Sequence, residues 1–217
     1  FCSENRKGIF IGSLSGPIPS GPGHSHQMVR DLSIIGSMPN LIFIEPYSQN
    51  MITDFFKLQK KYSESFYLRL TSVDLDLKNK TNLKLPNLGN MYELVKINKY
   101  TKKVVIIIGP VILQEILEIF HNIKLNKNIT VLIAVWLNRV STQQIKKLKN
   151  KDVFIYETTS SFGSFSSFLS LNCKLKNINF KKLKVRNVKE LPPCGKNDEV
   201  IKKINLDKKT IKKDLKL

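Results

Sequence analysis

Two histidines stand close together in a loop rich in glycine and proline, and they are the residues best suited to chemistry in this chain. His24, His26 and the adjacent Gln27 belong to the run Gly21-Pro-Gly-His-Ser-His-Gln27. A histidine side chain changes its charge near neutral pH, so it can donate a hydrogen bond or transfer a proton to a reacting substrate. The loop is therefore a candidate site for catalysis or substrate binding.

An arginine at the end of a predicted strand is a second candidate. Arg69 lies in Phe66-Tyr-Leu-Arg-Leu70. Ligands of open parallel sheets bind at the carboxyl ends of the strands, and a guanidinium group suits phosphate or another anion. The alternative is a surface salt bridge that would contribute little to stability. The sequence leaves both roles open for Arg69.

The sequence indicates no metal site. Cys2, Cys173 and Cys194 form no Cys-x-x-Cys pair and no cluster with histidine at ligand spacing. The third histidine, His121, ends an apolar helical pattern, near the negative end of the helix dipole. Scattered thiols are typical of a reducing compartment, and no secretory signal precedes the first predicted strand. We therefore expect a cytoplasmic protein.

The pattern of apolar residues predicts two α/β units. In the first part, strands are expected at 8–12, 41–45 and 66–70, and helices at 25–37 and from 48 or 50 to 59. After a polar linker at 74–90, strands are expected at 104–108, 130–136, 153–156 and 183–188, and helices at 111–123, 142–149, 160–173 and 205–217. This order implies parallel sheets with right-handed crossovers. Ser25 is the expected N-cap of helix 25–37, with Met28, Leu32 and Ile35 on its apolar face.

Composition and charge exclude several classes of protein. The 217 residues are 41% hydrophobic and 24% charged, as in ordinary globular proteins. The most apolar stretch, 104–113, is too short to span a membrane. The net charge of +19 suggests nucleic acid as a partner, but only five of the 36 basic residues are arginines, which nucleic-acid contacts favour. The spread lysines indicate a solvated surface, so we expect neither membrane nor nucleic acid as the main partner.

The histidine loop and the residues after it resemble the pyrimidine-binding domain of transketolase-like enzymes, which depend on thiamine diphosphate. In that family a loop of the type Gly-Pro-Thr-His-Gln is followed by an acidic residue and then by Ile-Pro-Asn-Leu before a strand that ends at proline. Here His26-Gln27, Asp31 and Met38-Pro39-Asn40-Leu41 keep that order without a gap.

The second part resembles the transketolase carboxy-terminal domain. The matching landmarks are a strand ending in glycine, a strand ending in glutamate and a glycine-containing helix start, at Ile108-Gly109, Phe154-Ile-Tyr-Glu157 and Phe162-Gly163-Ser164. The resemblance implies an α/β fold, with a partial parallel-sheet pyrimidine-binding domain at 1–82 and a smaller α/β transketolase carboxy-terminal domain at 83–217. Glu157 is expected to stabilise a helix N-terminus or an interface.

The resemblance also implies roles for the candidate residues. His26 would be the catalytic residue, because it stands at the family's usual distance from Asp31, and it would bind substrate hydroxyls and transfer protons. His24 would be an additional neighbour that binds substrate together with Gln27 and Arg69. No cofactor-binding residue and no metal ligand is identified.

Several parts of the family's machinery are not found in this sequence. Ser13-Leu14-Ser15 stands where the family has a His-Asp or Asp-Arg pair. The glutamate that activates the aminopyrimidine, and the motif that binds diphosphate and metal, both precede the matched region in the family. The implied cofactor, thiamine diphosphate with Mg²⁺, would then be held mostly by an amino-terminal section or a partner subunit. Because the chain begins at Phe1, close to a strand, we expect it to be the carboxy-terminal part of a longer protein.

The leading hypothesis is the carboxy-terminal section of a transketolase-like transferase that moves a two-carbon ketol unit between sugars or sugar phosphates. Alone, this section would be inactive. One alternative is a part like the beta subunit of a 2-oxoacid dehydrogenase decarboxylase, whose loop reads Gly-Pro-x-His-Ser, as at His24-Ser25. Another is a non-catalytic basic module that binds nucleic acid. We expect a dimer, or pairing with an amino-terminal partner, because loop 13–24 and the strand ends would otherwise face water.

Overall fold

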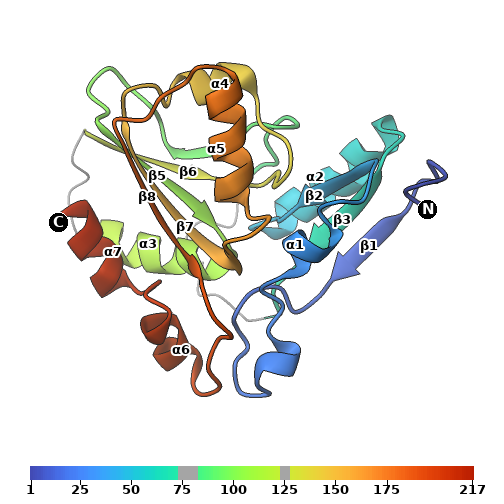
Figure 1. Ribbon diagram of the computed structural model, residues 1–217, viewed down its shortest axis with the longest axis horizontal. Coiled ribbons are helices and arrows are strands. Elements are labelled where there is room, and N and C mark those ends of the chain that lie inside the picture. The colour runs from blue at the N-terminus through green and yellow to red at the C-terminus, as the bar shows by residue number, and fades with distance from the viewer. Residues whose placement is uncertain (73–82, 123–127) are drawn as a thin grey trace.

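The computed structural model describes residues 1–72, 83–122 and 128–217. They form two α/β parts, each with its own β-sheet, that lie side by side (Figure 1). The first sheet has the strand order β1-β3-β2, and the second has the order β4-β6-β5-β7-β8. Neighbouring strands are parallel except β4 and β6, which are antiparallel. The predicted α/β class with parallel sheets is confirmed. The expected linker at 74–90 falls partly outside the described residues, and the boundary between 82 and 83 stays a prediction.

The first sheet occupies the amino-terminal part of the chain. Its strands are β1 (Ile9–Gly12), β2 (Leu41–Ile44) and β3 (Ser65–Arg69). The helical segments beside it are η1 (His24–His26), α1 (Asp31–Ile35), α2 (Gln49–Leu58) and η2 (Gln59–Lys61). Strands β2 and β3 are buried along their whole length, whereas the edge strand β1 leaves Phe10 and Ile11 exposed.

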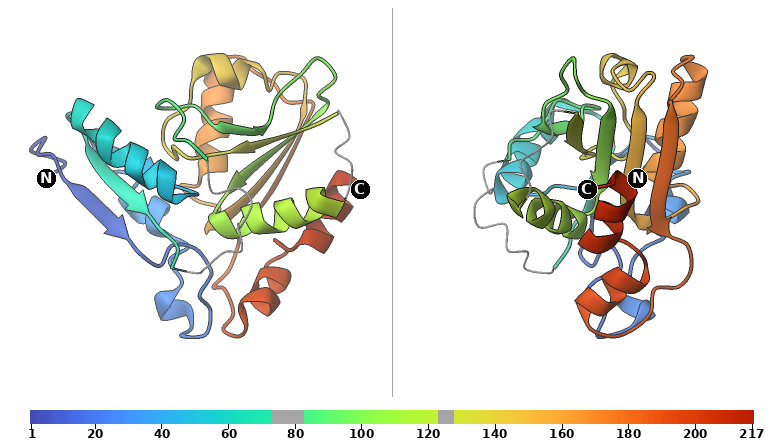
Figure 2. Two further views of the ribbon diagram at one scale, coloured as in Figure 1. Left: turned by 180° about the vertical axis from the view of Figure 1, so that it is seen from behind. Right: turned by 90° about the vertical axis from the view of Figure 1, so that its left-hand side faces the viewer.

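The second sheet is larger and has helices on both faces. Its strands are β4 (Tyr92–Val95), β5 (Lys103–Ile108), β6 (Ile129–Ile133), β7 (Asp152–Ser160) and β8 (Lys182–Val188). Its helices are α3 (Pro110–Asn122), α4 (Thr142–Lys146), α5 (Phe165–Leu175), α6 (Asn197–Lys203) and α7 (Lys208–Leu215). Figure 2 shows α3 and α7 on one face of this sheet and α5 on the other.

Alternation along the central strand β5 supplies both layers of the core. Val105 and Ile107 belong to the apolar cluster that includes α3 and α7, whereas Val104 and Ile106 belong to the cluster that includes α4 and α5. Successive side chains of a strand point to opposite faces. Because helices cover both faces, every position must be apolar, which explains the continuous apolar run in the sequence.

The backbone after β6 continues along β2 and joins the two sheets. Ile44 and Trp136 form an antiparallel bridge, and the N–H of Glu45 donates to the carbonyl of Val135 over 2.9 Å. The side chain of Asn138 makes two hydrogen bonds to β2. Its nitrogen donates to the Leu41 carbonyl over 2.7 Å, and its oxygen accepts from Phe43 N–H over 3.0 Å. These bonds satisfy the outer edge of β2, which would otherwise present unpaired backbone groups.

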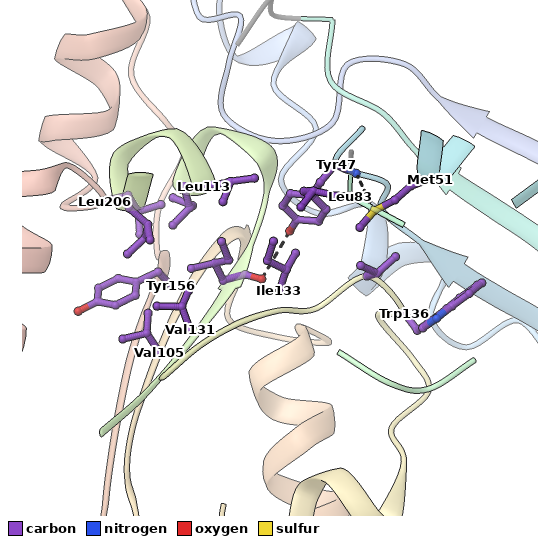
Figure 3. Close-up of a cluster of buried hydrophobic side chains, with 14 of the residues drawn as sticks. Tyr47, Met51, Leu83, Val105, Leu113, Val131, Ile133, Trp136, Tyr156 and Leu206 are labelled. Carbon is purple, nitrogen blue, oxygen red and sulfur yellow. Dashed lines mark hydrogen bonds between the residues drawn. The ribbon is translucent and has the colours of Figure 1, made fainter. Parts of the chain in front are cut away.

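A shared apolar cluster strengthens this junction. In Figure 3, Tyr47 and Met51 from the first part lie beside Ile133 from the second. The hydroxyl of Tyr47 accepts from Gly109 N–H over 2.7 Å, so the buried phenol is hydrogen-bonded across the junction. The two sheets therefore share one continuous core.

The largest departure from the predicted elements concerns helix 25–37. The chain forms only the short turn η1, then an extended stretch, and α1 begins at Asp31. Ser25 is not an N-cap, and of the expected apolar face Leu32 is buried while Met28 is 45% exposed. By contrast, the helix expected from 48 or 50 to 59 forms as α2, and Ser48 is its N-cap, accepting from Met51 N–H over 3.2 Å.

Other differences are smaller. Residue 160 belongs to β7, and α5 begins only at Phe165, since Ser164 is its N-cap. The last helix begins after its N-cap Asp207. Strand β4 and helix α6 were not predicted, because both are short, at four and seven residues. Among the helices formed by the described residues, none has the length and apolar character needed to cross a membrane.

Candidate functional site

A cavity of about 440 Å³ lies at the carboxyl end of β1. It is bordered by Ile11 and Gly12 of β1 and by His24 and His26 of the loop. Its volume falls in the range of roughly 300–1,000 Å³ that is typical of small-molecule pockets. The structure thus brings both predicted histidines to one concave surface at the end of a parallel strand.

Between η1 and α1 the chain is extended at Gln27 and pairs at Met28, and the burial of its side chains alternates from His26 to Asp31. His26, Met28 and Arg30 are exposed, whereas the residues between them, Gln27 and Val29, are buried. A parallel bridge links Met28 to Ser15, and the Met28 carbonyl accepts from Gly16 N–H over 2.9 Å. This pairing explains why the predicted helix does not form here, since a backbone paired with a neighbouring segment cannot make helical hydrogen bonds.

The buried residues of this segment anchor it to both parts of the chain. The amide nitrogen of Gln27 donates to the Pro17 carbonyl over 2.8 Å and to the Pro193 carbonyl over 3.1 Å. The Val29 carbonyl accepts from Ser160 N–H over 2.7 Å. Gln27 therefore positions the loop, and its predicted contact with substrate stays a prediction.

The two histidines occupy a single turn of 3-10 helix that follows Gly23. Gly23 has a φ of +88°, a value that glycine adopts without strain. Nδ1 of His26 lies 3.0 Å from the hydroxyl oxygen of Ser25. Because the turn is so short, both imidazoles border the cavity. The structure therefore places both histidines, and not one of them alone, at the edge of the cavity.

Arg69 is placed differently from what the sequence suggested. Its side chain is fully buried, and Nε donates to Asp31 Oδ2 over 2.8 Å while Nη1 donates to Glu45 Oε1. Two further contacts, to Thr158 Oγ1 at 3.3 Å and to the Met28 carbonyl at 3.4 Å, use remaining N–H groups. The alternative of a surface salt bridge is wrong. The predicted contact of Arg69 with substrate stays a prediction. In the structure its guanidinium pairs with the buried carboxylates of Asp31 and Glu45.

Burial and charge compete within this ion cluster. Burial raises the pKa of the Glu45 carboxyl, against the opposing effect of the Arg69 guanidinium. Burial lowers the pKa of Arg69, but the Glu45 and Asp31 carboxylates outweigh it and leave that pKa raised. Tyr67 donates to Asp31 over 3.1 Å, and burial, reinforced by this carboxylate, raises the pKa of the phenol. The cluster thus keeps one cation between two carboxylates, out of water.

The ion cluster also connects the two sheets, which the sequence did not reveal. Asp31, Glu45 and Arg69 come from the first part, while Thr158 comes from β7 of the second. In the sequence, Glu45 follows the apolar run of β2 and Arg69 ends that of β3, but their pairing depends on β2 and β3 being neighbours.

Arg30 is a cavity residue that the sequence did not single out. It borders the cavity beside His26, its side chain is exposed, and among the described residues it makes no ion pair. Its guanidinium can therefore reach an anionic ligand, the function that the sequence suggested for Arg69. The sequence gave no signal for Arg30, because the exposure of residues 26 to 31 depends on the path of the chain between η1 and α1.

Glu157 lies outside the cavity and holds the start of α5. Its Oε2 accepts from Ser166 N–H over 3.2 Å, and its Oε1 accepts from the Ser166 hydroxyl over 2.5 Å. Burial raises the pKa of this carboxyl, although the bonds from Ser166 oppose that effect. The expectation that Glu157 stabilises a helix N-terminus is confirmed.

Comparison of the sequence with protein-family models and with curated proteins gives no match. Solved structures are similar in fold. A split-gene transketolase, described as an inactive beta4 tetramer, matches 96% of this chain with a TM-score of 0.73 and 14% identity. Transketolase from Campylobacter jejuni also matches 96%, with a TM-score of 0.69 and 16% identity. Pichia stipitis transketolase in complex with sedoheptulose 7-phosphate matches 94%, with a TM-score of 0.64 and 15% identity.

The chain has a transketolase fold. The resemblance seen in the sequence is therefore confirmed for the fold, over nearly the whole chain. This transketolase-fold chain spans 65% of the split-gene protein, 31% of the Campylobacter enzyme and 29% of the Pichia enzyme. It corresponds to less than two thirds of any of these three proteins.

Proposed function

We propose that this chain is the carboxy-terminal section of a transketolase-like, thiamine diphosphate-dependent transferase that acts on sugars. The observation that carries the proposal is the cavity at the end of β1, where two exposed histidines and Arg30 gather within a transketolase fold. The order of the residues His26-Gln27, Asp31 and Pro39-Asn40 adds support from the sequence. The transferred group would be a two-carbon ketol unit, and sugars or sugar phosphates would be the substrates.

Within this proposal the residues at and behind the cavity have different roles. His26 binds substrate hydroxyls and transfers protons, with His24 beside it as a second donor. Arg30 offers a cation for a substrate phosphate, which suits the exposed and unpaired guanidinium. Gln27 acts from behind the cavity by holding the loop to the Pro17 and Pro193 carbonyls. Arg69 acts still further back, because its Nε holds Asp31 at the end of the loop.

The cavity does not fit the charged end of the cofactor. Mg²⁺ and a diphosphate require oxygen ligands such as carboxylates, and among the described residues no group of three or more His, Cys, Asp or Glu side chains could hold a metal ion. The nearby carboxylates of Asp31 and Glu45 are buried against Arg69. The proposal therefore assigns metal and diphosphate binding to an amino-terminal section or a partner subunit, with the assembled enzyme a dimer.

Reconstitution tests this proposal. The chain would be combined with a protein, encoded next to it, that carries the Gly-Asp-Gly motif and the activating glutamate. Ketol transfer between sugar phosphates would be measured with thiamine diphosphate and Mg²⁺. We expect activity only in the mixture, together with a larger species in light scattering. Two monomers at micromolar concentration, without activity, would contradict the proposal. Activity only with a 2-oxoacid would favour the dehydrogenase-type alternative.

A further inference from the structure

A second cavity is bordered by Pro193, the residue whose carbonyl accepts from Gln27 of the histidine loop. It has a volume of about 640 Å³ and lies between the end of β8, residues 189–193 and the end of α6. Four of its lining residues are basic, namely Lys184, Arg186, Lys189 and Lys203. Glu190 is its one acidic lining residue. The cavity is thus larger than the histidine cavity and strongly positive.

A buried carboxylate fixes two of these cations in place. Asp214 of α7 has a side chain only 2% exposed, and it accepts from Arg186 Nε over 2.6 Å and from Arg186 Nη2 over 2.8 Å. Lys184 Nζ donates to the same carboxylate over 2.5 Å. This bidentate contact immobilises the guanidinium before any ligand arrives, which reduces the entropic cost of binding.

The positive charge exceeds what the protein neutralises. Asp214 balances one of the two cations that it holds, whereas Lys189, Lys203 and the acidic Glu190 make no ion pair among the described residues, so the lining carries more positive than negative charge. The lysine-rich composition of the chain explains scattered surface charge. It does not explain an arginine held by a buried aspartate inside a cavity.

We propose that this cavity binds a small phosphate-bearing metabolite. Arginine and lysine together are the side chains expected around a phosphate, the first as a planar donor and the second as a point charge. The volume exceeds what a phosphate group fills, so the remaining space accommodates the organic part of a small metabolite. No residue of the histidine cavity takes part, so this site is separate from the proposed catalytic site.

The two cavities share one supporting segment. Pro193 borders the second cavity, and its carbonyl accepts the hydrogen bond from Gln27 that positions the histidine loop. Close by, the Ser20 hydroxyl donates to the Gly195 carbonyl over 2.8 Å, and Ser20 N–H donates to Asn197 Oδ1 over 3.0 Å. A ligand that orders residues 189–193 therefore also stabilises the loop that carries His24 and His26, and the coupling is reciprocal.

Titration of the full chain with inorganic phosphate tests the site. The measurement is NMR of the ¹⁵N-labelled protein, with chloride at equal ionic strength as reference. We expect saturable shifts at residues 184–193 and a matching shift of the imidazole signals of His24 and His26. Arg186→Gln should weaken binding roughly tenfold, the scale of losing a charge-assisted bidentate contact.

Because Arg186→Gln also disturbs Asp214, a second variant avoids that contact. Lys189→Gln/Lys203→Gln should weaken binding roughly threefold or more, since exposed ion contacts contribute modestly. Lys57→Gln/Lys60→Gln carries the same change of charge on exposed residues of the first part and should leave the affinity unchanged. Shifts without saturation, or equal weakening in the control variant, would overturn the site. The imidazole signals are also followed in Arg30→Gln, which removes the cation of the histidine cavity, and unchanged imidazole signals at saturation in that variant would overturn the coupling.

Discussion

The short segment from His26 to Asp31 separates two regions with opposite physical character. On one side is the histidine cavity, with His26 and Arg30 exposed. On the other is the buried ion cluster, in which Arg69 lies between Asp31 and Glu45. Both regions lie at the carboxyl ends of strands in the same sheet, and both contain an arginine. Their difference therefore comes from burial and from partners, not from position in the fold.

This difference indicates which side chains are available for a ligand. A buried guanidinium that donates to two carboxylates, a hydroxyl and a carbonyl has little capacity left for a substrate. The exposed side chains of the cavity have that capacity but contribute little to stability. Substitutions in the two regions should accordingly change different properties, stability in one and activity in the other.

The largest effect is expected for Arg69→Gln. Loss of the guanidinium leaves two buried carboxylates without their cation, which costs about 3–5 kcal/mol of the free energy of unfolding. Chemical denaturation measures this, with Arg30→Gln as the matched control, for which we expect a change within about 0.5 kcal/mol. Equal effects of the two substitutions would show that the buried cluster does not hold the sheets together.

The pH dependence of the same variant sharpens the comparison. Burial raises the pKa of Glu45, and Arg69 opposes this, so in Arg69→Gln the pKa should rise further. A carboxyl whose folded-state pKa exceeds its unfolded value stabilises the protein when protonated, and that contribution is lost as the pH rises through the folded-state pKa. The stability difference between variant and wild type should therefore narrow from pH 8 to pH 5. A difference that widens toward pH 5 would contradict this account.

The next largest effect concerns activity. In a reconstituted enzyme, His26→Ala should lower turnover roughly 10²-fold, the scale of losing a positioned proton donor, with little change in stability. His24→Ala should cost less, according to the resemblance that places His26 at the family's position. Steady-state kinetics on both variants measures the difference. A greater loss for His24→Ala would favour the Gly-Pro-x-His-Ser pattern and the dehydrogenase-type alternative.

A smaller stability effect is expected for Asp214→Asn. Asp214 is buried like Asp31, but its partners Lys184 and Arg186 are 36% and 28% exposed. Loss of the charged hydrogen bonds should cost about 1–3 kcal/mol at neutral pH. Although burial opposes it, the bonds from Arg186 and Lys184 lower the pKa of Asp214, so its contribution is present above the unfolded pKa and is lost as the pH falls through the folded-state pKa. In thermal unfolding, the midpoint temperatures of the variant and the wild type should differ at pH 7 and become equal in acid.

The smallest effect is expected in calorimetry, as the heat of cofactor binding to the chain alone. Neither the histidine cavity nor the ion cluster supplies ligands for a metal and a diphosphate, so calorimetry with thiamine diphosphate and Mg²⁺ should detect weak binding or none. Addition of the amino-terminal section should restore it. Tight, magnesium-dependent binding to residues 1–217 would contradict the assignment of the cofactor to another section.

The sequence by itself predicted the α/β class and most of the strands, because buried parallel strands require continuous apolar runs such as the one at 104–108. It also located the loop with His24 and His26, since glycine, proline and histidine stand out locally. It failed for helix 25–37. There, Met28 and Leu32 have helical spacing, but pairing of Met28 with Ser15 overrides that local preference.

Only the tertiary structure decided which charged side chains are buried in ion pairs and which are exposed. The strand end favoured Arg69 as the ligand for anions and gave no reason to single out Arg30, although the two are the same residue type. Only the packing of β2 beside β3 places Glu45 next to Arg69, and only the path of the chain between η1 and α1 leaves Arg30 exposed and Asp31 buried. The physical reason is that charge pairing depends on contacts between residues distant in sequence, whereas the spacing of apolar residues in a strand or helix can be seen within a few neighbouring residues.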